Sequence, residues 1–130
     1  MSVSLIISTY NRPDALLRVL ESVELQTKLP DEIIIADDGS DKKTKKCIED
    51  FNNYSSINLI HSWQRDNGFR AAESRNKAIS KSTCDYIILI DGDVILHNKF
   101  IEDHLRHSEV GFFVQGTRVF LDKTTTTSLI

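Results

Sequence analysis

This chain of 130 residues contains few cysteines and no long apolar run. Its two cysteines, Cys47 and Cys84, form no CxxC pair, which favours reduced thiols in a reducing compartment over a disulfide. The longest apolar runs are about five residues, whereas a membrane-spanning helix needs about 20. A first strand is expected from Val3, which leaves no room for a signal peptide. We therefore expect a soluble, cytoplasmic protein with no transmembrane segment.

Basic residues are too few for a protein that binds nucleic acid. The chain has 16 Lys and Arg against 19 Asp and Glu, which gives a net charge of −3 at pH 7. Binding to a phosphate backbone requires a basic face. Repeats and low-complexity linkers are absent as well, and the chain is long enough for a core of its own. We predict one globular domain with no nucleic-acid partner.

Apolar runs and helical spacings alternate along the chain. Short runs typical of strands cover residues 3–7, 32–36, 57–60, 86–90 and 112–116, and helices are expected over about 13–26, 41–51, 70–81 and 99–107. This alternation predicts an α/β fold, with a mostly parallel, doubly wound sheet and helices on both faces. Residues 1–122 are expected to form this core, whereas residues 123–130 lack a packing pattern and indicate a frayed or truncated tail.

The most informative motif is Asp91-Gly92-Asp93, which directly follows the apolar run 86–90. A strand that is apolar on both faces is typical of a parallel sheet covered by helices, and such sheets bind ligands beyond the carboxyl ends of their strands. Gly92 permits a tight turn, so that both carboxylates can converge on one hard cation. The sequence therefore predicts Asp91 and Asp93 as ligands of Mn²⁺ or Mg²⁺, completed by the phosphates of a nucleotide.

Two other polar motifs follow expected strands. Residues 8–11, Ser-Thr-Tyr-Asn, offer hydroxyls, an aromatic face and a helix N-terminus to a base and its phosphates, although, taken alone, they are explained better by a well-capped loop. The adjacent carboxylates of Asp37 and Asp38 repel each other unless a cation or a hydrogen-bond donor compensates their charge. An acid at this place commonly binds a ribose hydroxyl or a base N–H. The alternative is turn chemistry at 38–39 with Asp37 as a helix cap.

The expected helix over 70–81 carries two arginines. Arg75 lies in the apolar stripe with Ala71 and Ala78, so its guanidinium needs a carboxylate or phosphate partner. A ligand diphosphate would supply that partner, but so would a structural ion pair with an acid such as Asp91. Arg70 opens the helix, and solvation alone can account for it.

These motifs together resemble family 2 glycosyltransferases of the GT-A fold, which is a Rossmann-like fold. The matching segments, in chain order, are residues 7–12, 37–40, 67–76 and 91–93. Residues 114–120 resemble, more loosely, a segment of bacterial members that build surface polysaccharide or lipopolysaccharide. The resemblance covers nearly the whole chain, and it implies a nucleotide-sugar donor, with UDP as the default nucleotide, a saccharide acceptor and inversion at the anomeric carbon.

The resemblance also implies roles for single residues. The implied nucleotide-binding set is Thr9, Tyr10, Arg12, Asp37, Asp38, Arg70, Arg75 and Asp91, and the implied metal ligands are Asp91 and Asp93. Within this set, Asp38 would bind the base or ribose, with Asp37 in support. Arg70 or Arg75 would approach the diphosphate. Asp91 would face the ribose or bridge to the metal.

No catalytic base is assigned. In the family this base lies well past the DxD motif, and the later acids Glu102, Asp103 and Glu109 lie on or near an expected surface helix. The first hypothesis is therefore the donor half of a glycosyltransferase, from a longer or a truncated protein, active in the cytoplasm or at the inner face of the membrane. The second is a non-catalytic module that binds a nucleoside diphosphate. A phosphatase or a receiver domain is disfavoured because the acid pair follows the fourth expected strand.

Overall fold

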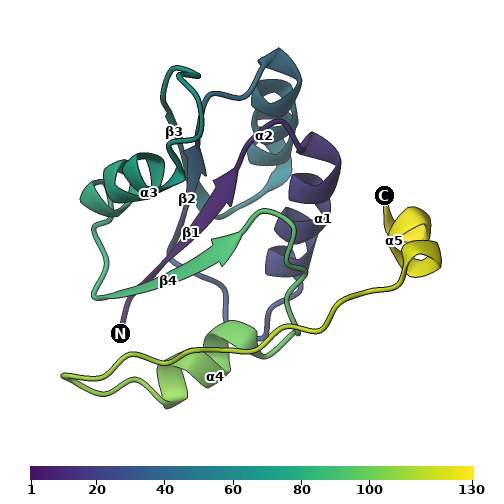
Figure 1. Cartoon of the computed structure of the whole chain (residues 1–130). Helices are drawn as coiled ribbons and strands as arrows, with labels where there is room; N and C mark the ends of the chain where they lie inside the picture. The colour runs from purple at the N-terminus through teal and green to yellow at the C-terminus, as the bar shows by residue number, and fades with distance from the viewer.

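The structure, a computed structural model, describes residues 1–130 as a four-stranded parallel sheet with helices on both faces (Figure 1). Its elements are β1 (Val3–Thr9), α1 (Pro13–Glu24), β2 (Glu32–Asp37), α2 (Lys42–Tyr54), β3 (Asn58–Trp63), α3 (Ala71–Ser80), β4 (Tyr86–Asp91), α4 (Phe100–Arg106) and α5 (Lys123–Leu129). The strand order is β3-β2-β1-β4. None of the helices is long and apolar enough to cross a bilayer.

The central strands β1 and β2 are buried because helices cover both of their faces. Leu5, Ile7 and Ile35 belong to the larger core, which α1 and α2 complete on one side of the sheet. Ile6 and Ile34 face the opposite side, where they pack against α3. In Figure 1, α3 lies on one side of the sheet, and α1 and α2 lie on the other. This arrangement confirms the predicted mostly parallel, doubly wound sheet.

Strand β3 extends three residues further than its apolar run predicted, through His61, Ser62 and Trp63. Each of these polar or aromatic residues has a hydrogen-bond partner. His61 Nε2 lies 2.8 Å from Asp37 Oδ2, and Trp63 Nε1 donates to the backbone oxygen of Ser40 at 3.0 Å. Ser62 accepts from a lysine of the α3 C-cap. Hydrogen bonding to neighbouring elements therefore extends the strand where hydrophobicity does not.

The strand predicted over residues 112–116 is wrong, because this segment pairs with no other strand. Its aromatic content favours strand structure, yet Phe112 and Phe113 remain 72% and 88% exposed. The segment passes beside α4, where Gly116 lies close to His104. Strand propensity requires a hydrogen-bonded neighbour to take effect, and β4 remains the edge of the sheet.

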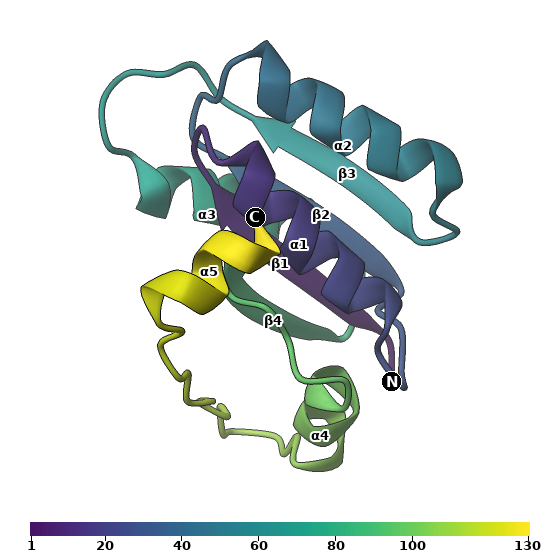
Figure 2. The same cartoon turned by 90° about the vertical axis from the view of Figure 1, so that its right-hand side faces the viewer.

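Residues 123–129 of the C-terminal segment form the helix α5. Asp122 caps α5, since its Oδ1 accepts the backbone N–H of Thr125 at 2.7 Å. The carbonyl oxygen of Leu129 accepts from Arg18 Nε of α1 at 2.6 Å, and Figure 2 shows α5 lying beside α1. An N-cap and one contact with α1 therefore order a segment that has no buried residue.

Candidate functional site

A cavity of about 450 Å³ opens where β1, β2 and β4 end and α3 begins. Its polar and charged lining residues include Ser8, Thr9, Tyr10, Arg12, Asp38, Asp66, Ser74, Asp91, Asp93 and Arg118. Ser8 pairs in register with Ala36 of β2 on one side and with Asp91 of β4 on the other. Because β1 separates β2 from β4, the acids that follow these two strands are roughly 10 Å apart. The cavity therefore has an Asp38 end and an Asp91 end.

Asp38 is held by hydrogen bonds to both of its carboxylate oxygens. Oδ1 accepts from Gln64 Nε2 at 2.7 Å, and Oδ2 accepts from the backbone N–H of Arg70 at 2.8 Å. The residue is 6% exposed and lines the cavity. These two donors fix the orientation of the carboxylate and stabilise its negative charge. The carboxylate is therefore positioned to accept a further hydrogen bond from a ligand.

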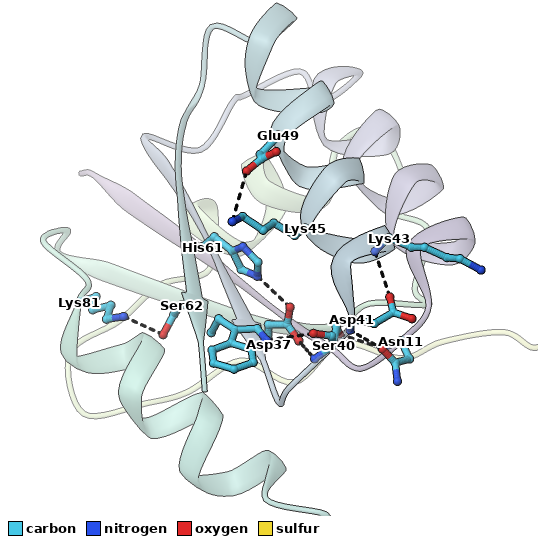
Figure 3. A network of polar contacts seen from close by, with 11 residues as sticks. Asn11, Asp37, Ser40, Asp41, Lys43, Lys45, Glu49, His61, Ser62 and Lys81 are labelled. Atoms are coloured by element: carbon cyan, nitrogen blue, oxygen red, sulfur yellow. Dashed lines mark hydrogen bonds and ion pairs between the residues drawn. The ribbon is translucent and has the colours of Figure 1, made fainter. Parts of the chain in front are cut away.

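Asp37 is fully buried and does not line the cavity. Its Oδ1 accepts the backbone N–H of Ser40 at 2.9 Å, and its Oδ2 contacts His61 Nε2 at 2.8 Å (Figure 3). The two adjacent acids therefore avoid repulsion by facing different partners. Asp37 braces the loop that presents Asp38, which agrees with a supporting role.

The loops after β1 and β2 are joined directly. Asn11 adopts a φ of 49°, a conformation that Asn tolerates better than most residues. Its backbone N–H donates to Ser40 Oγ, and its Oδ1 accepts from the backbone N–H of Asp41, both at 2.8 Å (Figure 3). Gly39 has a φ of +96°, and a Cβ there would lie 2.4 Å from the Cα of Asp66. Only glycine at position 39 allows the loop after β2 to approach the backbone of Asp66 so closely.

Tyr10 links the first loop to the segment that precedes α3. Its hydroxyl donates to Asp66 Oδ2 at 2.7 Å, and this hydrogen bond to a carboxylate raises the pKa of Tyr10 above its ordinary value. Both residues line the cavity, and the Tyr10 side chain is 47% exposed. The pair holds an aromatic ring at the cavity, where it can stack on a nucleotide base.

The acid pair at the carboxyl end of β4, Asp91 and Asp93, is much less constrained. Gly92 donates its N–H to the backbone oxygen of Ser8 at 2.7 Å, and a Cβ at Gly92 would lie 2.6 Å from that oxygen. This close approach brings Asp91 and Asp93 to the cavity. Asp91 Oδ2 lies 3.5 Å from Arg118 Nη1, while Asp93 has no hydrogen bond or ion pair.

The donor set at this end fits a divalent metal only in part. No group of three His, Cys, Asp or Glu side chains could hold a metal ion by itself. Asp91 and Asp93 supply hard oxygen donors from one cavity wall. Mg²⁺ and Mn²⁺ commonly use one or two carboxylates with waters and substrate phosphates. The two acids therefore fit a metal that a phosphorylated ligand completes.

Two buried hydroxyls in the cavity lining have no hydrogen-bond partner. Thr9 Oγ1 and Ser74 Oγ are both unpaired, and their residues are 8% and 2% exposed. An unsatisfied buried polar group destabilises a fold, so each such group calls for an explanation. Because both residues line the cavity, a polar ligand bound there is a candidate partner for each hydroxyl.

Six of the predicted site residues line this cavity: Thr9, Tyr10, Arg12, Asp38, Asp91 and Asp93. The other three, Asp37, Arg70 and Arg75, do not. Arg70 reaches Asp38 through its backbone N–H, while its guanidinium contacts Glu73. Arg75 borders a second cavity, about 1130 Å³, beside β4, with Nη2 4.0 Å from Asp91 Oδ1. The position of Arg75 therefore agrees better with a structural ion pair to Asp91 than with a contact to a ligand in the first cavity.

Sequence reasoning missed four residues: Gln64, Asp66, Ser74 and Arg118. Ser74 carried a usable signal, because it lies three residues after Ala71 and both line the cavity. Gln64 and Asp66 follow a strand, but no motif marks them. Arg118 lies in the segment 114–120, which resembles bacterial family members, but that resemblance implied no role for it, and the segment has no secondary structure.

The later acids do not contribute to this cavity. Glu102 Oε2 is 3.4 Å from Thr27 Oγ1, and Asp103 forms an ion pair with Arg106 on α4. Neither these two nor Glu109 belongs to the lining. No catalytic base can therefore be assigned past Asp93.

Comparison with known proteins gives consistent results. The chain is 29% identical to hyaluronan synthase from Pasteurella multocida over 94% of its own length, and 34% identical to the O-antigen chain rhamnosyltransferase RfbN from Salmonella typhimurium over 74%. It spans 13% and 29% of the length of these two relatives. The structure of TarS residues 1–349 from S. aureus, in complex with UDP-GlcNAc, matches with a TM-score of 0.72 at 25% identity. That match covers 82% of this chain and 30% of the TarS chain.

The parallel sheet and the cavity at its carboxyl edge define a Rossmann-like α/β protein of the GT-A type. The model of glycosyl transferase family 2 matches residues 4–129. The chain therefore belongs to glycosyl transferase family 2, as the sequence motifs predicted.

Proposed function

We propose that this chain carries the nucleotide-sugar donor site of an inverting, metal-dependent glycosyltransferase. The observation that supports this function best is a single cavity that brings together Asp38, after β2, and the acid pair Asp91 and Asp93, after β4. Family membership supports transfer of a sugar, and the complex of TarS with UDP-GlcNAc supports UDP as the nucleotide.

The nucleoside is assigned to the Asp38 end. The Asp38 carboxylate, held by two donors, would accept a hydrogen bond from the base or the ribose. Tyr10 would stack on the base, with Thr9 and Arg12 beside the nucleotide. Asp37 and the backbone of Arg70 act indirectly, because they position Asp38 and its loop.

The diphosphate is assigned to the Asp91 end. Asp93 would bind Mn²⁺ or Mg²⁺ directly, and Asp91 would share the metal or face the ribose. A bound cation would stabilise the negative charge that grows on the diphosphate as the sugar leaves. Arg75 does not itself line the cavity, and its Nη2 lies 4.0 Å from Asp91 Oδ1, so its proposed effect is to balance the charge of Asp91.

The proposed acceptor is a saccharide hydroxyl in surface polysaccharide or lipopolysaccharide synthesis. The names of the two relatives, hyaluronan synthase and O-antigen chain rhamnosyltransferase, support this class. Inversion requires the acceptor to attack from the face opposite the leaving diphosphate while a carboxylate removes its proton. A cytoplasmic location, at the inner face of the membrane, suits the two free cysteines.

A second candidate function is a module that binds nucleoside diphosphates without catalysis. The observation in its favour is that no acid beyond Asp93 lines the cavity, so the chain presents no residue placed to deprotonate an acceptor. Both candidates share the same binding site. They differ only in whether the bound donor turns over.

Calorimetric titration with UDP, GDP and dTDP, in Mn²⁺ and again in EDTA, tests the shared site. We expect UDP to bind with metal and to bind weakly or not at all in EDTA. Incubation with UDP-sugars, followed by detection of released UDP, then separates the two functions. Transfer or slow donor hydrolysis supports the enzyme, and binding without turnover supports the module. A folded chain that binds none of the nucleotides would refute both.

A further inference from the structure

Charge is poorly balanced within the cavity. Four carboxylates line it, from Asp38, Asp66, Asp91 and Asp93, whereas guanidinium groups come only from Arg12 and Arg118. A nucleoside diphosphate would add further negative charge to this lining. A metal ion compensates part of that charge, and the remainder requires a cationic side chain that can reach the phosphates.

Of the two arginines in the lining, Arg12 has the closer ion-pair partner. Its Nε lies 3.1 Å from Asp14 Oδ1, at the start of α1. The two arginines that the family resemblance implied, Arg70 and Arg75, lie outside the lining. Arg118 is the remaining candidate.

We propose that Arg118 is the diphosphate-binding arginine of this site, an inference that rests on the proposed donor-binding function. Arg118 Nη1 lies 3.5 Å from Asp91 Oδ2, at the end of the cavity assigned to the diphosphate. Its side chain is 60% exposed, and its guanidinium also lies 5.6 Å from the centre of the Phe120 ring. These contacts are weak enough to be exchanged for a phosphate.

The contact between Arg118 and Asp91 implies that both side chains exchange partners when a ligand binds. Without ligand, Arg118 neutralises Asp91, which is a proposed metal ligand. With a diphosphate and its metal bound, Asp91 would serve as a metal ligand, and Arg118 would be free to bind the phosphate oxygens, where its planar fork can form two hydrogen bonds. The segment around residue 118 has no secondary structure to oppose this movement. Nucleotide binding would then draw this segment onto the cavity.

Arg118→Gln tests the assignment, with Arg106→Gln as the matched control, because Arg106 is an exposed arginine of α4 outside the lining. In Mn²⁺, we expect Arg118→Gln to weaken UDP binding by about tenfold or more and to leave uridine binding unchanged. Arg118→Lys should fall between this variant and the wild type. Arg106→Gln should bind both ligands like the wild type.

Trypsin cleavage provides a readout on the unmodified chain. UDP with Mn²⁺ should slow cleavage after Arg118 relative to cleavage after Arg106, while uridine should not. Unchanged UDP affinity in Arg118→Gln, or equal losses for UDP and uridine, would overturn the role of Arg118 and leave the donor site intact. Failure of the wild type to bind UDP at all would instead refute the proposed function, and this inference with it.

Discussion

The two ends of the cavity differ in how firmly the protein holds their acids. At one end, Asp38 receives two hydrogen bonds, at 2.7 and 2.8 Å, from a side chain and a backbone N–H. At the other end, Asp91 has only arginine contacts at 3.5 and 4.0 Å, and Asp93 has no partner. The protein itself supplies close donors to the acid of the first end, whereas the acids of the second end have only distant partners or none.

This difference follows from the sheet. The Asp38 end lies after β2, between β1 and β3, so loops from both sides close around it and supply donors. The Asp91 end follows β4, the edge strand, and borders a segment without secondary structure. We therefore expect substitutions at the first end to change both stability and binding, and substitutions at the second end to change binding alone.

The largest effect is expected from Asp37→Ala, which would break the bracing beneath Asp38. The change leaves the buried Ser40 N–H without its acceptor and removes the partner of His61. We expect a loss of roughly 3 kcal/mol in the free energy of unfolding, measured by urea denaturation. Asp37→Asn, which retains an acceptor oxygen, should lose less. Wild-type stability in Asp37→Ala would show that this end is not braced as described.

Asp93→Ala provides the opposite case. Because Asp93 has no hydrogen bond or ion pair, its removal should leave the urea midpoint unchanged. Binding of UDP in Mn²⁺ should weaken by about ten- to a hundredfold, as expected for the loss of one charged contact. Calorimetry measures the affinity, and Asp103→Ala on α4 is the matched control. Unfolding of Asp93→Ala would mean that this acid is structural.

Ser74→Ala should have smaller effects of opposite sign. Its hydroxyl is buried and unpaired, so alanine should stabilise the fold by about 1 kcal/mol. The same change should weaken UDP binding by roughly fivefold, because a hydrogen bond to the ligand is lost. Thermal unfolding with and without UDP measures both effects. A variant that is more stable and binds UDP as well as the wild type would show that the hydroxyl does not contact the ligand.

The smallest effect is expected at Glu32, which opens β2 at the end of that central strand remote from the cavity. Burial alone would raise the pKa of Glu32, but hydrogen bonds from Ser4 and Thr83 outweigh it and hold the pKa below its ordinary value of 4.5. Its contribution to stability is therefore present above pH 4.5 and is lost as the pH falls through the lowered folded-state pKa.

Glu32→Gln should consequently reduce the loss of stability below pH 4.5, as followed by urea midpoints across the acid range. UDP binding at pH 7 should not change, which makes this variant a control for both ends of the cavity. An unaltered acid profile would show that the hydrogen bonds around Glu32 do not favour its charged form.

Sequence patterns predicted the four-stranded sheet, the helices α1 to α4 and six cavity residues, because these depend on local signals. Apolar runs mark strands, and the turn between Asp91 and Asp93 requires a glycine. The structure of residues 112–116 could not be predicted this way, because this segment pairs with no strand although β4 leaves one edge of the sheet free. Asp66 and Arg118 also escaped prediction, because only the folded chain brings them to the cavity. Their roles depend on contacts between distant segments.

The most direct test of the difference between the two ends compares uridine with UDP on the wild-type chain, in Mn²⁺ and in EDTA. The preformed Asp38 end should bind uridine with the same affinity in both conditions. Only UDP should gain affinity from the metal, because only UDP reaches Asp91 and Asp93. If uridine loses affinity in EDTA as much as UDP does, or if UDP binds equally in both conditions, the assignment of the two ends is wrong.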